Sequence, residues 1–256
     1  MNPEKFALAV GVAVFVGGSL GLIFRGVLPE KHVSGGAKDM VGAVVGLLTL
    51  LSALVLGLLI WTAYGVYAGQ NIAIQTLASK VLQLDLALAD YGPEANGARA
   101  QIRDGLGKTI DEIWHSNESD VDFVANNFAA AIHNLRNREA SLGALHPATD
   151  AQTQALAAAK ATVDSIGQSR LQMSFALASP ISIPLIVIVV AWATFLFFGY
   201  GLMSGGGATS FIAVAFGAVA VASAAYLILD LSSPYSGIFR ASPVPLEQVL
   251  AVMGKE

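Results

Sequence analysis

The sequence predicts an all-α integral membrane protein with four transmembrane helices and a cytoplasmic helical bundle inserted between spans two and three. Three observations support this prediction. Of the 256 residues, 55% are hydrophobic and 12% are charged, about half the charged fraction of an average soluble domain. Two long tracts hold no charged residue: 40 residues between Asp39 and Lys80, and 59 residues between Arg170 and Asp230. Most of the charge lies between these tracts, because residues 69–176 hold 8 of the 14 basic and 12 of the 18 acidic residues.

Four segments are long and apolar enough to cross a bilayer as helices, which takes about 20 residues each. We expect these spans at 6–24, 41–60, 181–203 and 211–229. The first segment has a signal peptide as its alternative reading. Its apolar run is longer than the apolar core of a usual signal peptide, and no small-x-small cleavage site follows before Arg25, so we favour a retained anchor. Glycines and serines at 204–210 predict a tight turn between the last two spans.

The polar insert has the residue spacing of helices. Apolar residues recur at steps of three and four, and we predict helices over 70–89, 98–114, 120–142 and 150–176. The stripes that predict them include Ile74, Leu77, Val81, Leu84 and Leu88, then Val121, Val124, Phe128, Ala131 and Leu135, and finally Leu156, Ala159, Val163 and Ile166. No proline or turn cluster separates the second span from the first of these helices, so we expect one continuous rod there. The same holds between the last of them and the third span, as far as Pro180.

These elements divide the chain into four parts. We assign 1–68 to the first two spans, 69–176 to the bundle, 177–232 to the last two spans and 233–256 to a short C-terminal tail. Four spans place the insert and both termini on one side of the membrane. That side carries five basic residues near the membrane against three on the other, namely Lys5, Lys80, Lys160, Arg170 and Arg240 against Arg25, Lys31 and Lys38. Cytoplasmic loops are enriched in such residues, so we expect a multi-pass protein of the cell membrane with the insert and both termini in the cytoplasm.

Composition and motifs exclude several classes of function. The net charge of −4 argues against nucleic acid as a partner. The absence of cysteine excludes disulfides, thiolate metal sites and a cysteine nucleophile. No nucleophile elbow, phosphate-binding loop, dinucleotide fingerprint or zinc-protease motif occurs, so we expect no enzyme, no catalytic residue and no cofactor. A helix-face set of possible metal ligands is more simply a solvated acidic surface, and we expect no metal there: Asp111, His115, Glu118 and Asp122.

The second span carries a stripe of small residues at four-residue spacing on one helix face: Gly42, Gly46, Thr49, Ala53 and Gly57. Small residues at this spacing allow two helices to approach closely. The alternative is that the stripe lines a narrow pore, with the hydroxyls of Thr49 and Ser52 facing the pathway. Both roles are compatible if this span surrounds the axis of an oligomer. The pairs Gly17–Gly21 and Gly65–Gly69 repeat the spacing.

The end of the fourth span holds a second group of candidates. Asp230 closes the long uncharged tract, and an ionisable residue at the membrane edge is a candidate functional group. The plainer reading is an interfacial carboxylate, alone or paired with Arg240. Pro234, Tyr235 and Gly237 predict a turn that follows directly.

Three segments resemble the bestrophin-like domain family of bacterial and plant membrane proteins. They are DMVGAVVGLLTLLSALVLGLLIWTAYGVY (39–67), IDEIWHSN (110–117) and LDLSSPYSG (229–237). The family is similar to bestrophins, which are pentameric anion channels with four spans, a helical cytosolic part and a second span that lines the pore. The resemblance therefore implies an oligomeric channel with span two at its axis. The acidic calcium clasp and the aromatic neck of animal bestrophins have no counterpart here, so their pore residues are not transferred.

These observations lead to two hypotheses for function. The first is a homo-oligomeric ion channel, pentameric and anion-conducting by analogy, with span two along the pathway of the permeant ion and the lipid bilayer around it. The second is a membrane scaffold or sensor that transports nothing and whose cytoplasmic bundle binds a partner protein. It rests on the scarcity of ionisable residues within the spans, since transporters usually place such groups there.

Overall fold

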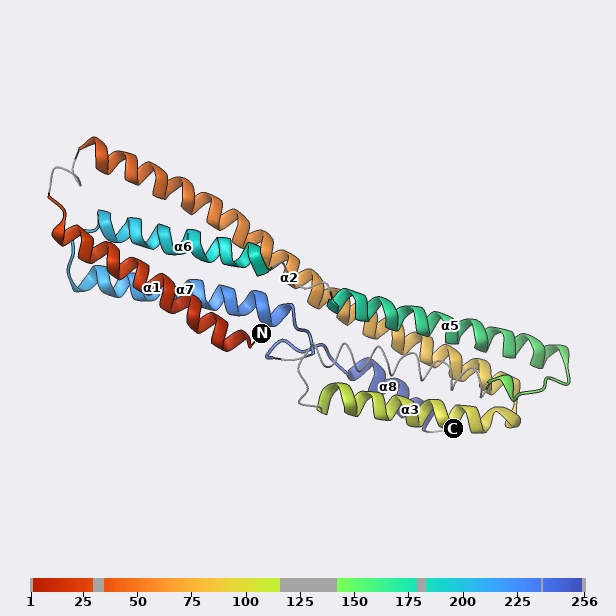
Figure 1. Ribbon diagram of the computed structural model, residues 1–256. Coiled ribbons are helices and arrows are strands. Elements are labelled where there is room, and N and C mark those ends of the chain that lie inside the picture. Colours follow the sequence, from red (N-terminus) through yellow and green to blue (C-terminus); the bar gives the residue numbers. More distant parts are fainter. Residues whose placement is uncertain (1, 30–34, 116–141, 179–182, 236, 255–256) are drawn as a thin grey trace. The chain divides into compact units, whose positions relative to one another are not determined.

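The computed structural model describes residues 2–29, 35–115, 142–178, 183–235 and 237–254. All regular elements in these ranges are helices (Figure 1), as predicted. They are α1 (Pro3–Val27), α2 (Gly36–Tyr91), the 3₁₀ helix η2 (Pro93–Ala95), α3 (Asn96–His115), α5 (Asp150–Ala178), α6 (Ile183–Met203), α7 (Ala208–Leu231) and α8 (Val244–Met253).

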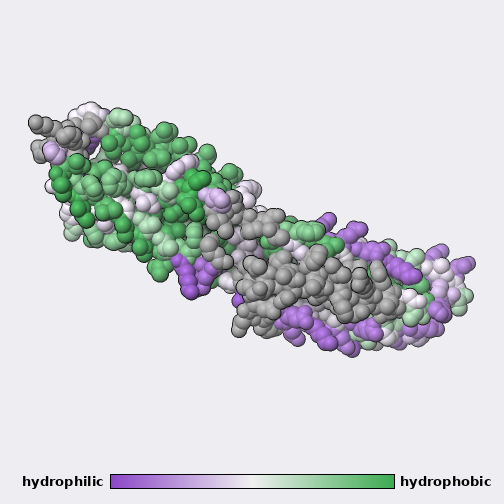
Figure 2. All heavy atoms as spheres, viewed as in Figure 1, coloured by the Kyte–Doolittle hydropathy of each residue, from purple (hydrophilic) through white to green (hydrophobic). Residues whose placement is uncertain are grey.

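Four of these helices are long and apolar enough to cross a membrane, namely α1, α2, α6 and α7. They contain the predicted spans at 6–24, 41–60 and 211–229, and α6 matches the described part of the span predicted at 181–203. Their outward side chains are largely apolar: Leu8, Leu50 and Phe216 each expose 70% or more of their surface. Figure 2 shows the hydrophobic residues gathered over these helices, while hydrophilic residues lie over α3 and α5. Apolar surface of this extent is stable in the hydrocarbon core of a bilayer and not in water.

The chain divides into two compact units. The first unit contains Met1–Gly65 and Ile181–Ser232, and the second contains Val66–Pro180 and Ser233–Glu256. The continuous helix α2 contributes its first half to the first unit and its second half to the second unit. This confirms the prediction that no break separates the second span from the helix that follows it.

In the first unit, α1 packs against both α6 and α7, and glycines allow the close approach. A Cβ atom on Gly21 would overlap the carbonyl oxygen of Phe198 in α6, and one on Gly201 would lie 2.5 Å from the carbonyl oxygen of Gly18. On the α7 side, a Cβ on Gly18 would lie 2.5 Å from Val214. The pair Gly17–Gly21 therefore marks a helix crossing, as the small-xxx-small spacing suggests.

A glycine-rich turn joins α6 to α7 within the same unit. Gly206 and Gly207 have φ angles of +77° and +103°, which favour glycine because a Cβ atom would clash with the backbone. Ser204 and Ser210 share a hydrogen bond between their hydroxyls at 2.5 Å across the turn. A turn is thus confirmed within the predicted segment, over 204–207, while residues 208–210 already belong to α7.

The second unit has its own apolar core. The predicted stripe of α2 from Ile74 to Leu88 is buried, as are the stripes of α3 (Ile102, Leu106 and Ile110) and α5 (Leu156 to Ile166). A partly buried ion pair joins two of these helices: Arg99 of α3 donates to both carboxylate oxygens of Asp85 in α2, at 2.8 and 2.9 Å. Hydrogen bonding to both oxygens offsets much of the desolvation of the two charges.

The C-terminal segment is part of this core. The sequence assigns 233–256 to a short tail, but α8 packs against α3 and buries Leu246, Val249 and Met253 in the core of the second unit. Apolar residues at steps of three and four make α8 amphipathic, and its apolar face is covered by the bundle. The helix predicted over 120–142 and the junction at 179–182 lie outside the described residues.

The glycine crossing leads to a stability prediction. Alanine in place of glycine normally stabilises a helix by about 1 kcal/mol. At Gly21 we expect alanine to destabilise the protein instead, because the added methyl group meets the Phe198 carbonyl and forces α1 away from α6. The free energy of unfolding should fall by about 1–3 kcal/mol. Thermal unfolding of the Gly21→Ala protein in detergent measures the effect.

Gly26→Ala is the matched control, because it lies on the same helix and no described atom lies within 4 Å of its Cβ position. Gly26→Ala should leave the melting temperature unchanged or raise it. Equal melting temperatures for the two variants would contradict the close crossing.

Candidate functional site

The first half of α2 has a covered side and an open side within the first unit. On the covered side, Val45 packs against Gly199 of α6, and Leu59 and Ala63 are also buried. The open side carries large apolar side chains that are 59–72% exposed: Leu47, Leu50, Leu54 and Leu58. Because these leucines recur at steps of three and four, they form one continuous face of the helix.

The two hydroxyl residues predicted to line a pathway lie toward the covered side. The Thr49 hydroxyl donates to the Val45 carbonyl oxygen at 2.8 Å and shares a hydrogen bond with the Tyr200 hydroxyl of α6 at 3.0 Å. The Ser52 hydroxyl oxygen has no exposed surface and no hydrogen-bond partner among the described residues. Thr49 therefore links α2 to α6 within the chain.

The small residues of the stripe are divided between the two sides. A Cβ on Gly42 would lie 3.1 Å from the Met203 side chain of α6. Gly46 and Gly57 have no described atom within 4 Å of the Cβ position, and Ala53 is exposed. Gly46, Ala53 and Gly57 thus form an open strip next to the leucine face, which we call the small-residue strip. Gly65 and Gly69 also have open surroundings.

The membrane-edge candidates belong to different units. Asp230 lies in the last turn of α7 in the first unit and is fully buried. The Tyr226 hydroxyl, one turn earlier, donates to its Oδ1 at 3.2 Å. Pro234, Tyr235, Gly237 and Arg240 belong to the second unit, where the first two are buried and the last two are exposed.

In the second unit, Tyr235 lies at the centre of a buried polar cluster. Its hydroxyl donates to Gln70 Oε1 in α2 at 2.8 Å, and Gln70 Nε2 donates to the Met173 carbonyl oxygen of α5 at 3.3 Å. The Tyr235 ring meets the Trp114 ring of α3 edge-on, with centroids 6.0 Å apart. One tyrosine thereby contacts side chains from α2 and α3 and is linked through Gln70 to α5.

Two further hydrogen bonds close the loop that carries Tyr235. Trp114 Nε1 donates to the Ala241 carbonyl oxygen at 2.7 Å, and the Ala241 amide donates to the Pro234 carbonyl oxygen at 2.7 Å. Gly237, between them, has a φ of +86°, which confirms the predicted turn. All of these groups are uncharged, and their hydrogen bonds hold the loop in place against α2 and α3. Such groups can bind and position other groups.

Burial raises the pKa of the Tyr235 phenol well above its ordinary value, because the phenolate would lose its hydration. The phenol therefore keeps its proton even at alkaline pH, and this proton makes the hydrogen bond to Gln70.

Sequence reasoning missed Gln70, although a signal was present. Gln70 lies four residues before Ile74 and continues the buried stripe of α2 with a polar side chain. A glutamine at a core position needs hydrogen-bond partners, and Tyr235 and Met173 supply them. Of the four residues considered as possible metal ligands, Glu118 and Asp122 lie outside the described residues. Elsewhere in the described chain no group of three or more His, Cys, Asp or Glu residues is placed to hold a metal ion.

Comparison with known families gives one match. Residues 11–246 match the family model described as the Bestrophin-like domain. This range includes α2, α6 and α7, most of α1, and the segment from Asp230 to Arg240. Neither the curated proteins nor the solved structures contain a match to this chain.

The raised pKa of Tyr235 predicts how stability depends on pH. In the unfolded chain the phenol ionises near its ordinary pKa of 10.0, whereas in the folded protein it keeps its proton at that pH. The folded state then binds more protons than the unfolded state, so the free energy of unfolding should fall as pH rises above about 10, by about 1.4 kcal/mol per pH unit. Unfolding measured between pH 8 and 11 checks this.

The Tyr235→Phe variant should lack this component of the pH dependence and lose about 1–3 kcal/mol at pH 8, because Gln70 Oε1 loses its donor. Tyr64→Phe is the matched control, since Tyr64 is half exposed. If Tyr235→Phe shows the same alkaline slope as the wild type, the phenol is not protected by burial.

Proposed function

Because this chain belongs to the bestrophin-like domain family, we propose that it is a homo-oligomeric ion channel of the cell membrane in which α2 lines the pore. The similarity of the family to bestrophins supports an anion-conducting pentamer. In this arrangement the second unit, which carries most of the charge, lies in the cytoplasm with both termini.

The observation that most supports this role is the poor coverage of α2. In its most apolar stretch, 11% of the residues are buried within the subunit, against 33% for α1 and α6 and 22% for α7. A span that its own subunit leaves so open has surface available for other copies of the chain. The small-residue strip of Gly46, Ala53 and Gly57 would let neighbouring copies of α2 approach closely around an axis.

The chemistry of α2 is compatible with ion passage. No charged residue lies between Asp39 and Lys80, so the pathway would be neutral. A neutral pore of small and apolar side chains conducts by partial dehydration of the ion, and apolar constrictions gate it by dewetting. The hydroxyls of Thr49 and Ser52 remain candidate pore groups, but Thr49 would have to exchange its bond to Tyr200 for contact with the ion.

A membrane scaffold is the second candidate. It is favoured by the scarcity of charge inside the spans, where the described helix α6 has no ionisable acidic or basic residue and α7 has only Asp230 near its end. In this role the second unit, with its own core, binds a partner protein. Purified protein that conducts no ions would favour it.

Ionic current from the purified full-length protein in a planar bilayer tests the channel directly. Under a KCl gradient we expect discrete openings with a reversal potential displaced toward the chloride equilibrium potential. Displacement toward the potassium equilibrium potential would contradict the anion preference. Silence from protein that is shown to be folded would contradict the channel itself.

Cysteine substitution tests which face of α2 lines the pathway, because the natural chain has no cysteine. A charged thiol reagent should reduce the current of Gly46→Cys and Ala53→Cys by more than half, since the modified side chains would protrude into the pore. Leu54→Cys on the leucine face serves as the matched control and should be insensitive. Block of Leu54→Cys alone would place the leucine face, not the small-residue strip, along the pore.

A further inference from the structure

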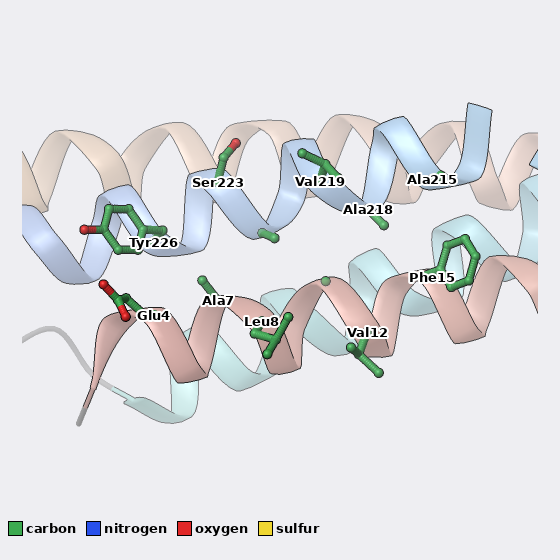
Figure 3. A pocket seen from close by; sticks show the side chains of 12 residues that line it. Glu4, Ala7, Leu8, Val12, Phe15, Ala215, Ala218, Val219, Ser223 and Tyr226 are labelled. Carbon is green, nitrogen blue, oxygen red and sulfur yellow. The ribbon is translucent and has the colours of Figure 1, made fainter. Parts of the chain in front are cut away.

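A groove runs between α1 and α7 within the first unit (Figure 3), with a volume of about 590 Å³. Its walls are mostly apolar and small, among them Leu8, Val12, Phe15, Ala215, Ala218 and Val219. Leu8 is 70% exposed and Val219 is 66% exposed, so the groove is open along its side to the surrounding medium. The function proposed above makes no use of it.

The length of the groove corresponds to one leaflet of a bilayer. On α1 it extends from Glu4 to Phe15, which at 1.5 Å per residue is about 17 Å. The hydrocarbon core is about 30 Å thick, so the groove covers about half of it. At the inner end the Phe15 ring packs edge-on against Phe211 of α7, with centroids 5.3 Å apart. A helix of a second copy would cross both leaflets, whereas this groove is closed near the middle of the span.

The other end of the groove is polar and negatively charged. Glu4 in the first turn of α1 and Tyr226 near the end of α7 lie together there (Figure 3). The Tyr226 hydroxyl donates to Asp230, which places a second carboxylate next to this end. None of the residues lining the groove is basic. This end lies at the edge of the spans, where phospholipid headgroups are found.

We propose that the groove binds one acyl chain of a phospholipid whose headgroup carries an ammonium group. The acyl chain lies along the apolar walls and ends at the Phe15–Phe211 contact. The ammonium group lies at the Glu4 carboxylate and within reach of the Tyr226 hydroxyl oxygen. The Glu4 carboxylate favours a headgroup that carries a cationic group. The inference depends on the first unit lying in a bilayer and is independent of whether the protein conducts ions.

Native mass spectrometry of the full-length protein tests the site. The protein is equilibrated in nanodiscs with equal amounts of phosphatidylethanolamine and phosphatidylglycerol, then released and analysed for lipid that stays bound. We expect about one retained phospholipid per chain, mainly phosphatidylethanolamine. Ala215→Trp fills the groove and should abolish most of this retention. Ala213→Trp is the matched control, because Ala213 is an exposed residue of α7 outside the groove.

The charge is tested separately by Glu4→Gln, which preserves the shape of the side chain. It should retain the lipid but lower the preference for phosphatidylethanolamine over phosphatidylglycerol by about threefold, the size of effect expected for an exposed ion pair. Equal retention by the two tryptophan variants would overturn the groove as the lipid site. An unchanged headgroup preference in Glu4→Gln would overturn the role of the carboxylate, even if Ala215→Trp were unstable.

Discussion

The close crossing of α1 and α6 is the contact on which the rest of the first unit depends. In lipid there is no hydrophobic force between two apolar helices, so they associate through van der Waals packing over short distances. Gly17 and Gly21 on α1 and Gly201 on α6 bring the two backbones within that range. With α6 in place on one side of α1, α7 packs on another, and the lipid-sized groove between α1 and α7 follows from this arrangement.

Helix α2 shows how burial changes along a single element. Before Gly65 its exposed leucines belong in a membrane or against other copies of the chain. After Val66 its apolar stripe is covered by α3, α5 and α8. The polar residue Gln70 lies where this second pattern begins, with both ends of its amide hydrogen-bonded. One uninterrupted helix therefore exposes its apolar side chains in its first half and buries them in a core in its second half.

Local pattern predicted most of the helices, because the length of an apolar run and the spacing of its residues are properties of neighbouring positions. The spans, the turn at 204–210 and the buried stripe from Ile74 to Leu88 are all of this kind. Contacts between distant positions had no such signal. The packing of α8 on α3 and the bond from Tyr235 to Gln70 join residues that are far apart in the chain, and periodicity does not reveal them.

The face of α2 was predicted only in part for the same reason. The spacing of Gly42, Gly46, Thr49, Ala53 and Gly57 places them on one side of the helix, but it does not say which neighbour that side meets. The structure divides the stripe, since Thr49 bonds to Tyr200 while Gly46 and Gly57 are open. What those open positions contact is set by their surroundings in the membrane, which periodicity within a single sequence does not describe.

The position of α8 has a consequence for the order of events during synthesis. Leu246, Val249 and Met253 complete a core whose other helices are made much earlier. At about 5–20 residues per second, several seconds separate the emergence of α5 from that of α8. During this interval α6 and α7 are produced and insert into the membrane, while the earlier helices have an incomplete core. Final closure of the second unit is therefore a late step that follows membrane insertion.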